Sequence, residues 1–337
     1  MVASATLHNE HVRVTVLTGK GCDIHELCDL TTGVDVLAKA RVQLSDLQPG
    51  VHAPDSAEAW LAQYVGGWQV LLPNGGAPGR RGGAEWGFHG EASQLRWNVT
   101  DQTDTRLDAY VRLLRAPLLV TRRLEIAAAT VRVTESVQNE GATPLELMWV
   151  HHPAFGAPFL DAGCLLSAGA RTVVADDENP GTALIAGSVN PWPKATTRNG
   201  GQLSLDEAPG PDSGIAHLAY LSDFESGYFA ITNPGLRLGV ALSWDTDVFP
   251  HAWYWAEARA TSAFPFFGRH YTLAIEPATS VPAQGIDALA AKTGKPLILA
   301  PGQTIATTLE ATLFHDDRRV AGVRSGRIEF VEAGGPR

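Results

Sequence analysis

The stretch Thr130-Val131-Arg132-Val133-Thr134-Glu135-Ser136-Val137-Gln138 alternates valine with polar side chains along most of its length. Such alternation is typical of an antiparallel strand with one face in the core and the other in solvent. Residues 106–114 and 119–126 alternate in the same way, and turn residues follow at 139–144. Short strands in regular series predict a sandwich or a barrel. The 337-residue length favours a large, multi-sheet antiparallel sandwich.

The rest of the chain extends this pattern, because helix-favouring runs are scarce while glycine and proline are common. Two short helices are expected, over 55–61 and 286–293, and a glycine-rich loop over 72–83. We expect one all-β domain over residues 1–326 and a tail, 327–337, that frays. Further strands are expected at 12–17, 34–38, 145–152 (ending at Pro153), 216–221, 228–232, 236–244, 252–257, 271–276 and 304–314.

The overall charge excludes several classes of partner. The net charge is -10, which argues against nucleic acid, because phosphate binding needs clustered positive charge. No long basic run is present that could bind an anionic membrane surface, and no stretch of about 18 apolar residues could span a bilayer. The N-terminus lacks a basic start followed by an apolar segment, so a cytoplasmic protein is expected.

Cys22, His25 and Cys28 have a spacing that could surround one metal ion. If this segment is a strand, residue 25 faces away from the other two, and the sulfurs lie about 20 Å apart at about 3.3 Å per residue. The strand interpretation therefore argues against a metal site. Three cysteines, an odd number, do not indicate a disulfide framework.

Two stretches place histidine where a substrate could reach it. In Gly87-Phe88-His89-Gly90-Glu91 the glycine after His89 permits close approach to the backbone, although a turn histidine is the alternative. His151 and His152 follow an apolar segment. Neighbours on a strand face opposite ways, so one of them is expected in a cleft while the other packs. The upstream pattern does not choose between them, and two structural histidines remain the alternative.

Glu276 lies in Leu273-Ala274-Ile275-Glu276-Pro277 and shares a strand face with Thr272 and Ala274. These small neighbours leave room for a ligand, and a carboxylate in an apolar strand is costly unless it is paired or functional. The alternative is a glutamate at the rim of a strand. Together with the histidines, Glu276 could support acid/base chemistry without a metal or cofactor.

Aromatic residues are numerous, and they gather around 252–257. On a strand Trp253 and Trp255 share one face with Glu257, which makes a platform for the flat face of a sugar, with core packing as the alternative. The Arg80-Arg81 pair could bind an anion such as a sugar phosphate, although a solvated loop is the more economical interpretation. The phosphate-binding, dinucleotide and Gly-x-Ser-x-Gly motifs are absent.

The sequence resembles the aldose 1-epimerase (galactose mutarotase-like) superfamily over most of its length, and the histidine and glutamate motifs carry the resemblance. Phe88-His89-Gly90-Glu91 with Trp97 resembles the first histidine motif of that family, and residues 150–155 resemble the second. Ile275-Glu276-Pro277 with Pro282 resembles its C-terminal glutamate motif. The order His, His, Glu is also that of the family.

The resemblance implies an antiparallel β-supersandwich and the interconversion of α and β anomers of a free aldose. Glu276 would be the general base at the anomeric hydroxyl, His152 the general acid at the ring oxygen, and His89 a hydrogen-bond partner of the ring. No cofactor is implied. The expected partner is a small sugar, and the expected assembly is a monomer or homodimer.

The chain departs from the better-known members, which carry an Asn-Arg pair upstream of the first histidine. Here Asn74 is followed by glycine, so Arg80 or Arg81 is expected to substitute for the arginine. The substrate-binding aspartate of the family has only weak candidates, Asp223 and Asp245. The expected substrate-binding set is His151, Asn74, Arg80, Arg81, Trp253, Trp255 and Glu257. Two other functions stay open: a carbohydrate-binding protein without catalysis, and a hexose-6-phosphate 1-epimerase.

Overall fold

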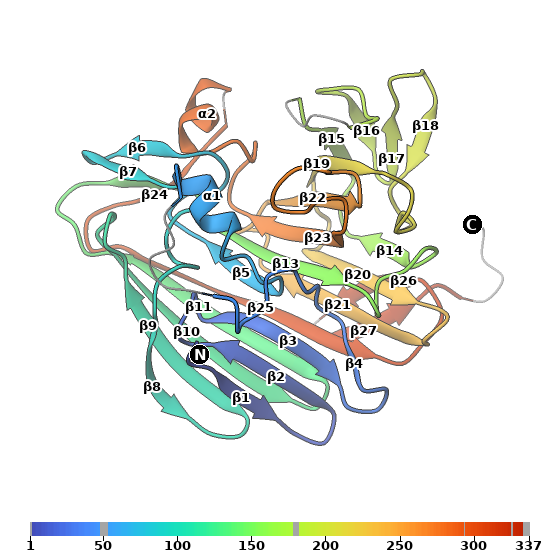
Figure 1. Cartoon of the computed structure of the whole chain (residues 1–337), viewed down its shortest axis with the longest axis horizontal. Helices are drawn as coiled ribbons and strands as arrows, with labels where there is room; N and C mark the ends of the chain where they lie inside the picture. Colours follow the sequence, from blue (N-terminus) through green and yellow to red (C-terminus); the bar gives the residue numbers. More distant parts are fainter. Residues whose placement is uncertain (1, 48–52, 178–181, 293, 325, 333–337) are drawn as a thin grey trace.

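The computed structural model describes residues 2–47, 53–177, 182–292, 294–324 and 326–332, and two large antiparallel sheets dominate it (Figure 1). Strands make up 48% of the structure and helices only 4%. The predicted all-β sandwich is therefore confirmed. Within the described residues no helix combines the length and the apolar character that crossing a membrane requires.

The first sheet carries the segments on which the sequence analysis placed the histidines and the glutamate. Among the described residues, the strands of this sheet pair antiparallel. Its spatial order is β1 (Ala5–His8), β2 (Val12–Leu17), β3 (Asp23–Asp29, which also pairs with β4, Val34–Asp35), β5 (Trp68–Leu71), β13 (Val150–Gly156), β23 (Tyr271–Ala278), β22 (His251–Ala258), β19 (Ala216–Ser222), β15 (Thr172–Ala175) and β16 (Val189–Pro191).

The second sheet contains the alternating stretch that predicted the fold, now strand β11. Its order is β14 (Leu165–Ala168), β20 (Tyr228–Asn233), β21 (Leu238–Trp244), β25 (Thr304–Phe314), β11 (Thr130–Asn139), β10 (Leu118–Ala127), β9 (Arg106–Arg112) and β8 (Asn98–Gln102). Smaller two-stranded pairs are β6 (Gly79–Arg81) with β7 (Ala84–Trp86), β12 (Leu145–Leu147) with β24 (Leu297–Leu299), β17 (Lys194–Thr196) with β18 (Gln202–Ser204), and β26 (Val320–Arg324) with β27 (Arg327–Phe330).

The two sheets pack their inward faces against one core. On β11 the side chains of Val131, Val133, Glu135 and Val137 are buried, and the residues that alternate with them are half-buried or exposed. Strand β13 differs, because all of its residues are buried. It runs in the middle of the first sheet between β5 and β23, so one face meets the core while loops and helix α1 cover the other.

Two short helices lie over the first sheet, close to the β6–β7 hairpin (Figure 1). Helix α1 (Ser56–Leu61) begins where the side chain of its N-cap residue, Asp55, accepts a hydrogen bond from the Glu58 N–H. Helix α2 (Ile286–Ala291) also forms where the sequence predicted one. Residue 293, where that prediction ended, lies outside the described residues.

Three local predictions are wrong. The strand expected over 145–152 divides into β12 and β13, and β13 continues through Pro153, because the fixed φ of proline fits an extended strand and removes a single donor. The segment expected as a loop over 72–83 contributes strand β6 to the β6–β7 hairpin. Residues 327–330 form β27 instead of fraying, because Ile328 and Phe330 pack on the apolar cluster beneath β26. Residues 333–337 lie outside the described part.

Candidate active site

A cavity of about 480 Å³ lies on the face of the first sheet that points away from the core. This volume is within the range of small-molecule sites, which are mostly apolar with a few converging polar groups. Its aromatic walls come from α1, β22 and the neighbouring loops: Trp60, Tyr64, Phe88, Trp253, Trp255 and Phe266. Its polar side chains are His89, His152, Asp176, Glu276 and Gln284.

Strand alternation and register bring the central groups together. Trp253 on β22 pairs with Glu276 on β23. On the other side of β23, Val150 pairs with Ala278 and Ala154 with Ala274, a register that places His152 opposite Glu276. Three adjacent strands therefore present an indole, a carboxyl and an imidazole on one face.

His152 and Glu276 form the polar centre of the cavity. The His152 Nε2 atom lies 3.7 Å from the Glu276 Oε1 atom, and their side chains are only 6% and 3% exposed. Burial raises the pKa of Glu276 well above its ordinary value and lowers the pKa of His152 to about 4. Both shifts favour the uncharged forms, so the pair holds one transferable proton on the carboxyl side.

His89 reaches the same cavity from the loop after β7. Its backbone is left-handed, with φ 56°, and the Gly76 N–H donates a 2.9 Å hydrogen bond to its Nδ1 atom. Burial lowers the pKa of His89 well below its ordinary value, so the ring is neutral and its proton belongs on Nε2. Its ring centroid lies 6.3 Å from that of His152. His89 can therefore donate a hydrogen bond in the cavity.

His151, expected to bind substrate, does not line the cavity. Being next to His152 on β13, it points the other way, into the core between the sheets. There its Nε2 atom lies 2.6 Å from Glu135 Oε2 on β11, and its Nδ1 atom accepts a hydrogen bond from Trp68. Of the two neighbouring histidines, His152 therefore faces the cavity and His151 faces the core.

Four other expected binding residues also lie outside the cavity. The buried Asn74 amide holds its own loop, since it donates to the carbonyls of Ala77 and Gly87 and accepts from Ile286. Arg80 and Arg81 belong to β6, so they do not substitute for a cavity arginine; the Arg81 guanidinium pairs with carboxylates outside the cavity.

Glu257 lies on the same strand as the two cavity tryptophans, but it does not line the cavity. Its carboxylate accepts hydrogen bonds from the N–H and hydroxyl of Thr261, at 3.0 and 2.7 Å, and so anchors the β22–β23 loop. Trp253 and Trp255 do line the cavity. The weak candidates Asp223 and Asp245 do not line it.

The sequence reasoning missed a polar group at the β19–β15 side of the cavity. Asp176, just after β15, accepts hydrogen bonds from the Tyr220 hydroxyl and the Gln284 amide, and both Asp176 and Gln284 line the cavity. Asp176 stood in an acidic stretch that reads as a solvated loop, and Gln284 in the turn before α2. No periodic signal marks either residue.

Among the described residues, no group of three or more His, Cys, Asp or Glu side chains is arranged to hold a metal ion. Cys22, Cys28 and Cys164 are free and buried. Burial raises the pKa of the Cys22 thiol to about 12, so this side chain behaves as a small apolar group.

The chain is similar to one protein family by sequence. The model of the family described as "Domain of unknown function (DUF4432)" matches residues 2–313. No curated protein matches the sequence significantly.

Solved structures share the fold at low sequence identity. A galactose mutarotase-like protein from Lactobacillus casei ATCC 334 is 16% identical with a TM-score of 0.66, covering 93% of this chain and 100% of its own. A galactose mutarotase related enzyme from Lactobacillus acidophilus is 14% identical with a TM-score of 0.64, covering 94% and 99%. The GalM/aldose epimerase homologue from C. elegans is 14% identical with a TM-score of 0.60, covering 93% and 100%. The fold is therefore galactose mutarotase-like.

Proposed function

The chain belongs to the family described as "Domain of unknown function (DUF4432)", and we propose that it is a sugar epimerase of the aldose 1-epimerase type. The observation that carries the proposal is the His152–Glu276 pair, 3.7 Å apart at the centre of an aromatic-walled cavity. Named structural neighbours described as mutarotase-like support it at the level of fold. The expected location is the cytoplasm.

Interconverting anomers needs one proton removed and one delivered. A base takes the proton of the anomeric hydroxyl while an acid protonates the ring oxygen, the ring opens, and the aldehyde recloses on its other face. Reclosure reverses the two transfers, so no cofactor is consumed. In the proposed roles Glu276 is the base and His152 the acid, while His89 donates a hydrogen bond from Nε2 to the ring region.

These roles require the charged form of the pair, a carboxylate beside an imidazolium, whereas burial favours the uncharged form. Sugar hydroxyls that donate hydrogen bonds to Glu276 would lower its pKa. Binding of substrate therefore favours the proton distribution that ring opening needs.

The remaining lining suits a monosaccharide. Trp253, Trp255 and Trp60 offer flat faces to the C–H surfaces of a sugar ring. Asp176 and Gln284 offer acceptors and a donor for hydroxyl groups at the β19–β15 side. The second candidate function, carbohydrate binding without catalysis, would use the same walls. It would not require an acid/base pair such as His152 and Glu276.

The proposal is tested by exchange spectroscopy on the purified protein. Magnetisation transfer between α and β anomers, measured across a panel of free aldoses, is expected to accelerate in proportion to protein concentration. Binding without acceleration for every sugar would leave the non-catalytic function standing and remove the epimerase.

Substituting His152 and His151 one at a time separates catalysis from stability. His152→Asn is expected to slow anomer exchange by roughly 100-fold or more, because it removes the proton donor, with little change in the melting temperature. His151→Asn is expected to lower the melting temperature, because it removes the buried partner of Glu135, while the folded fraction keeps its exchange rate. Exchange that survives His152→Asn and fails in His151→Asn would mean that the catalytic face is wrongly assigned.

Asp176 is expected to act in sugar binding. Asp176→Asn keeps the shape of the side chain but replaces one acceptor oxygen by a donor. The loss of one hydrogen bond from the sugar to this carboxylate should raise KM by roughly tenfold and change kcat less. Steady-state exchange at varied sugar concentration measures both. Asp223→Asn, at a position that does not line the cavity, is the matched control. An unchanged KM in Asp176→Asn would place the sugar away from this group.

A further inference from the structure

A second hollow, of about 200 Å³, adjoins the catalytic cavity. The two share Leu61, Tyr64 and Phe266 as lining residues. Tyr64 is the wall between them: its ring centroid lies 6.0 Å from that of His152 on the cavity side and 6.0 Å from that of His270 on the other. A group bound in this hollow would therefore lie next to the reacting ring.

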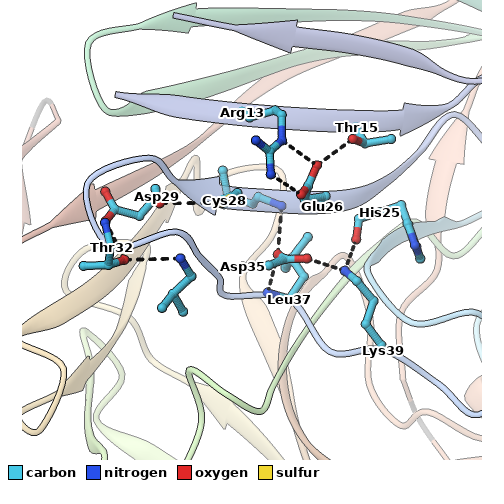
Figure 2. A network of polar contacts seen from close by, with 12 residues as sticks. Arg13, Thr15, His25, Glu26, Cys28, Asp29, Thr32, Asp35, Leu37 and Lys39 are labelled. Atoms are coloured by element: carbon cyan, nitrogen blue, oxygen red, sulfur yellow. Dashed lines mark hydrogen bonds and ion pairs between the residues drawn. The ribbon is translucent and has the colours of Figure 1, made fainter. Parts of the chain in front are cut away.

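The hollow is lined by cationic side chains and by no carboxylate. Its cations are Lys39, Arg41 and Arg269, in a protein whose net charge is -10. Lys39 is already engaged, because its ammonium group binds Asp35 and the His25 carbonyl, as Figure 2 shows. Arg41 contacts the ring of Phe267, 5.4 Å from its guanidinium carbon.

Within the described residues neither Arg41 nor Arg269 lies within ion-pair distance of a carboxylate, although most arginines of this chain do. The two side chains come from different segments, the stretch after β4 and the β22–β23 loop. Arg41 and Arg269 are exposed and line the same hollow without a carboxylate partner among the described residues, an arrangement that suits a ligand bringing the negative charge.

His270 adds a buried group to the same hollow. It is 5% exposed, and its Nε2 atom has no hydrogen-bond partner. The ring stacks on Phe266 at a centroid distance of 4.6 Å and an interplanar angle of 9°. A buried imidazole nitrogen without a partner is costly unless a ligand satisfies it.

On the basis of the proposed function, we propose that this hollow is an anion subsite, and that the substrate is a sugar bearing an acidic substituent. The oxyanion, a carboxylate or a phosphate, lies between Arg41 and Arg269 and accepts a hydrogen bond from His270. The reacting ring lies beyond Tyr64, between Trp255 and the His152–Glu276 pair. The Arg80–Arg81 pair has no part in this recognition.

The test compares matched sugars: the free hexose, the hexuronic acid and the hexose 6-phosphate of the glucose and galactose series. Anomer exchange gives kcat/KM for each. One acidic class is expected to exceed the matching hexose by roughly 10- to 100-fold, the range of charge-assisted hydrogen bonds. In the Arg41→Gln/Arg269→Gln variant that preference should fall by at least tenfold. Which acidic class is preferred distinguishes carboxylate from phosphate.

Arg324→Gln/Arg327→Gln is the control, because both are exposed arginines of the β26–β27 hairpin and their substitution removes the same two charges elsewhere. It should leave the acidic-over-neutral ratio unchanged. Equal kcat/KM for acidic and neutral sugars, or a preference that survives loss of both arginines, would overturn the subsite.

Calorimetric binding of the same sugars separates this inference from the function on which it rests. Acidic sugars that bind in an arginine-dependent way without exchange would support the subsite and remove the epimerase. Rapid exchange of neutral hexoses, with no gain from an acidic group, would support the epimerase and remove the subsite.

Discussion

Glu276→Gln is expected to reduce the catalysed rate of anomer exchange by roughly 100- to 10,000-fold, the contribution of a positioned acid or base. Glutamine keeps the shape and hydrogen-bonding reach of the side chain but cannot take up or give a proton. Because Trp253 and His152 stay in place on the neighbouring strands, the sugar should still bind. The measurement is magnetisation transfer between anomers at saturating sugar, with the binding constant determined separately.

The same substitution should not destabilise the protein. Burial raises the pKa of Glu276, so at neutral pH its ionisation costs folding free energy, and this cost grows as pH rises above the ordinary carboxyl pKa. A neutral glutamine avoids that cost. The melting temperature of the Glu276→Gln variant above pH 7 should therefore equal or exceed that of the unsubstituted protein. Near-normal exchange by a folded Glu276→Gln variant would remove the proposed mechanism.

The sequence predicted the sheets well because period-two alternation is a local signal. Strand β25 and strand β2 have the predicted bounds, and β11 differs from its prediction by a single residue. The convergence of His89, His152 and Glu276 was expected only through their resemblance to a family. Nothing in spacing alone says that β13 and β23 lie side by side, since a long stretch of chain separates them.

The wrong predictions of site residues share one physical cause. In loops, and on strands buried on both faces, the direction in which a side chain points depends on tertiary packing. His151 and His152 could not be told apart because β13 is apolar on both sides. Arg80 and Arg81 were expected at the substrate as substitutes for the arginine of the family's Asn-Arg pair, but they lie in the β6–β7 hairpin and do not line the cavity. Asp176, Arg41 and Arg269 enter the two hollows from segments without periodic pattern.

Strand β11, whose alternation predicted the fold, also contains a charged residue at a position where an apolar side chain is expected. Glu135 occupies an inward position of β11, in phase with the buried valines, and its side chain is fully buried. Its carboxylate pairs with the buried Arg122 at 2.9 Å and contacts His151 at 2.6 Å. Arg122 in turn donates to the Cys22 carbonyl and lies over the ring of Trp97. This polar cluster links the two sheets directly behind His152.

Glu135→Gln is expected to destabilise the protein by about 3–5 kcal/mol, because it leaves the buried Arg122 charge without its counterion. Glu310→Gln is the control: its partner Arg132 is half exposed, and the loss should be about 1 kcal/mol or less. Denaturant titrations at pH 7 measure both free energies of unfolding. Equal losses in the two variants would contradict the argument.

The effect of Glu135 should also depend on pH in a defined direction. Burial by itself would raise the pKa of Glu135, but Arg122 and His151 outweigh it and lower the pKa to about 2. A carboxyl whose pKa is depressed on folding stabilises the native state above its unfolded pKa, near 4.5, and loses that contribution as pH falls towards 2. The stability difference between the unsubstituted protein and Glu135→Gln should therefore be constant from pH 7 to about 5 and shrink below it. A difference that widens on acidification would mean that Glu135 is protonated in the folded protein, and that the two sheets are joined here by hydrogen bonds without an ion pair.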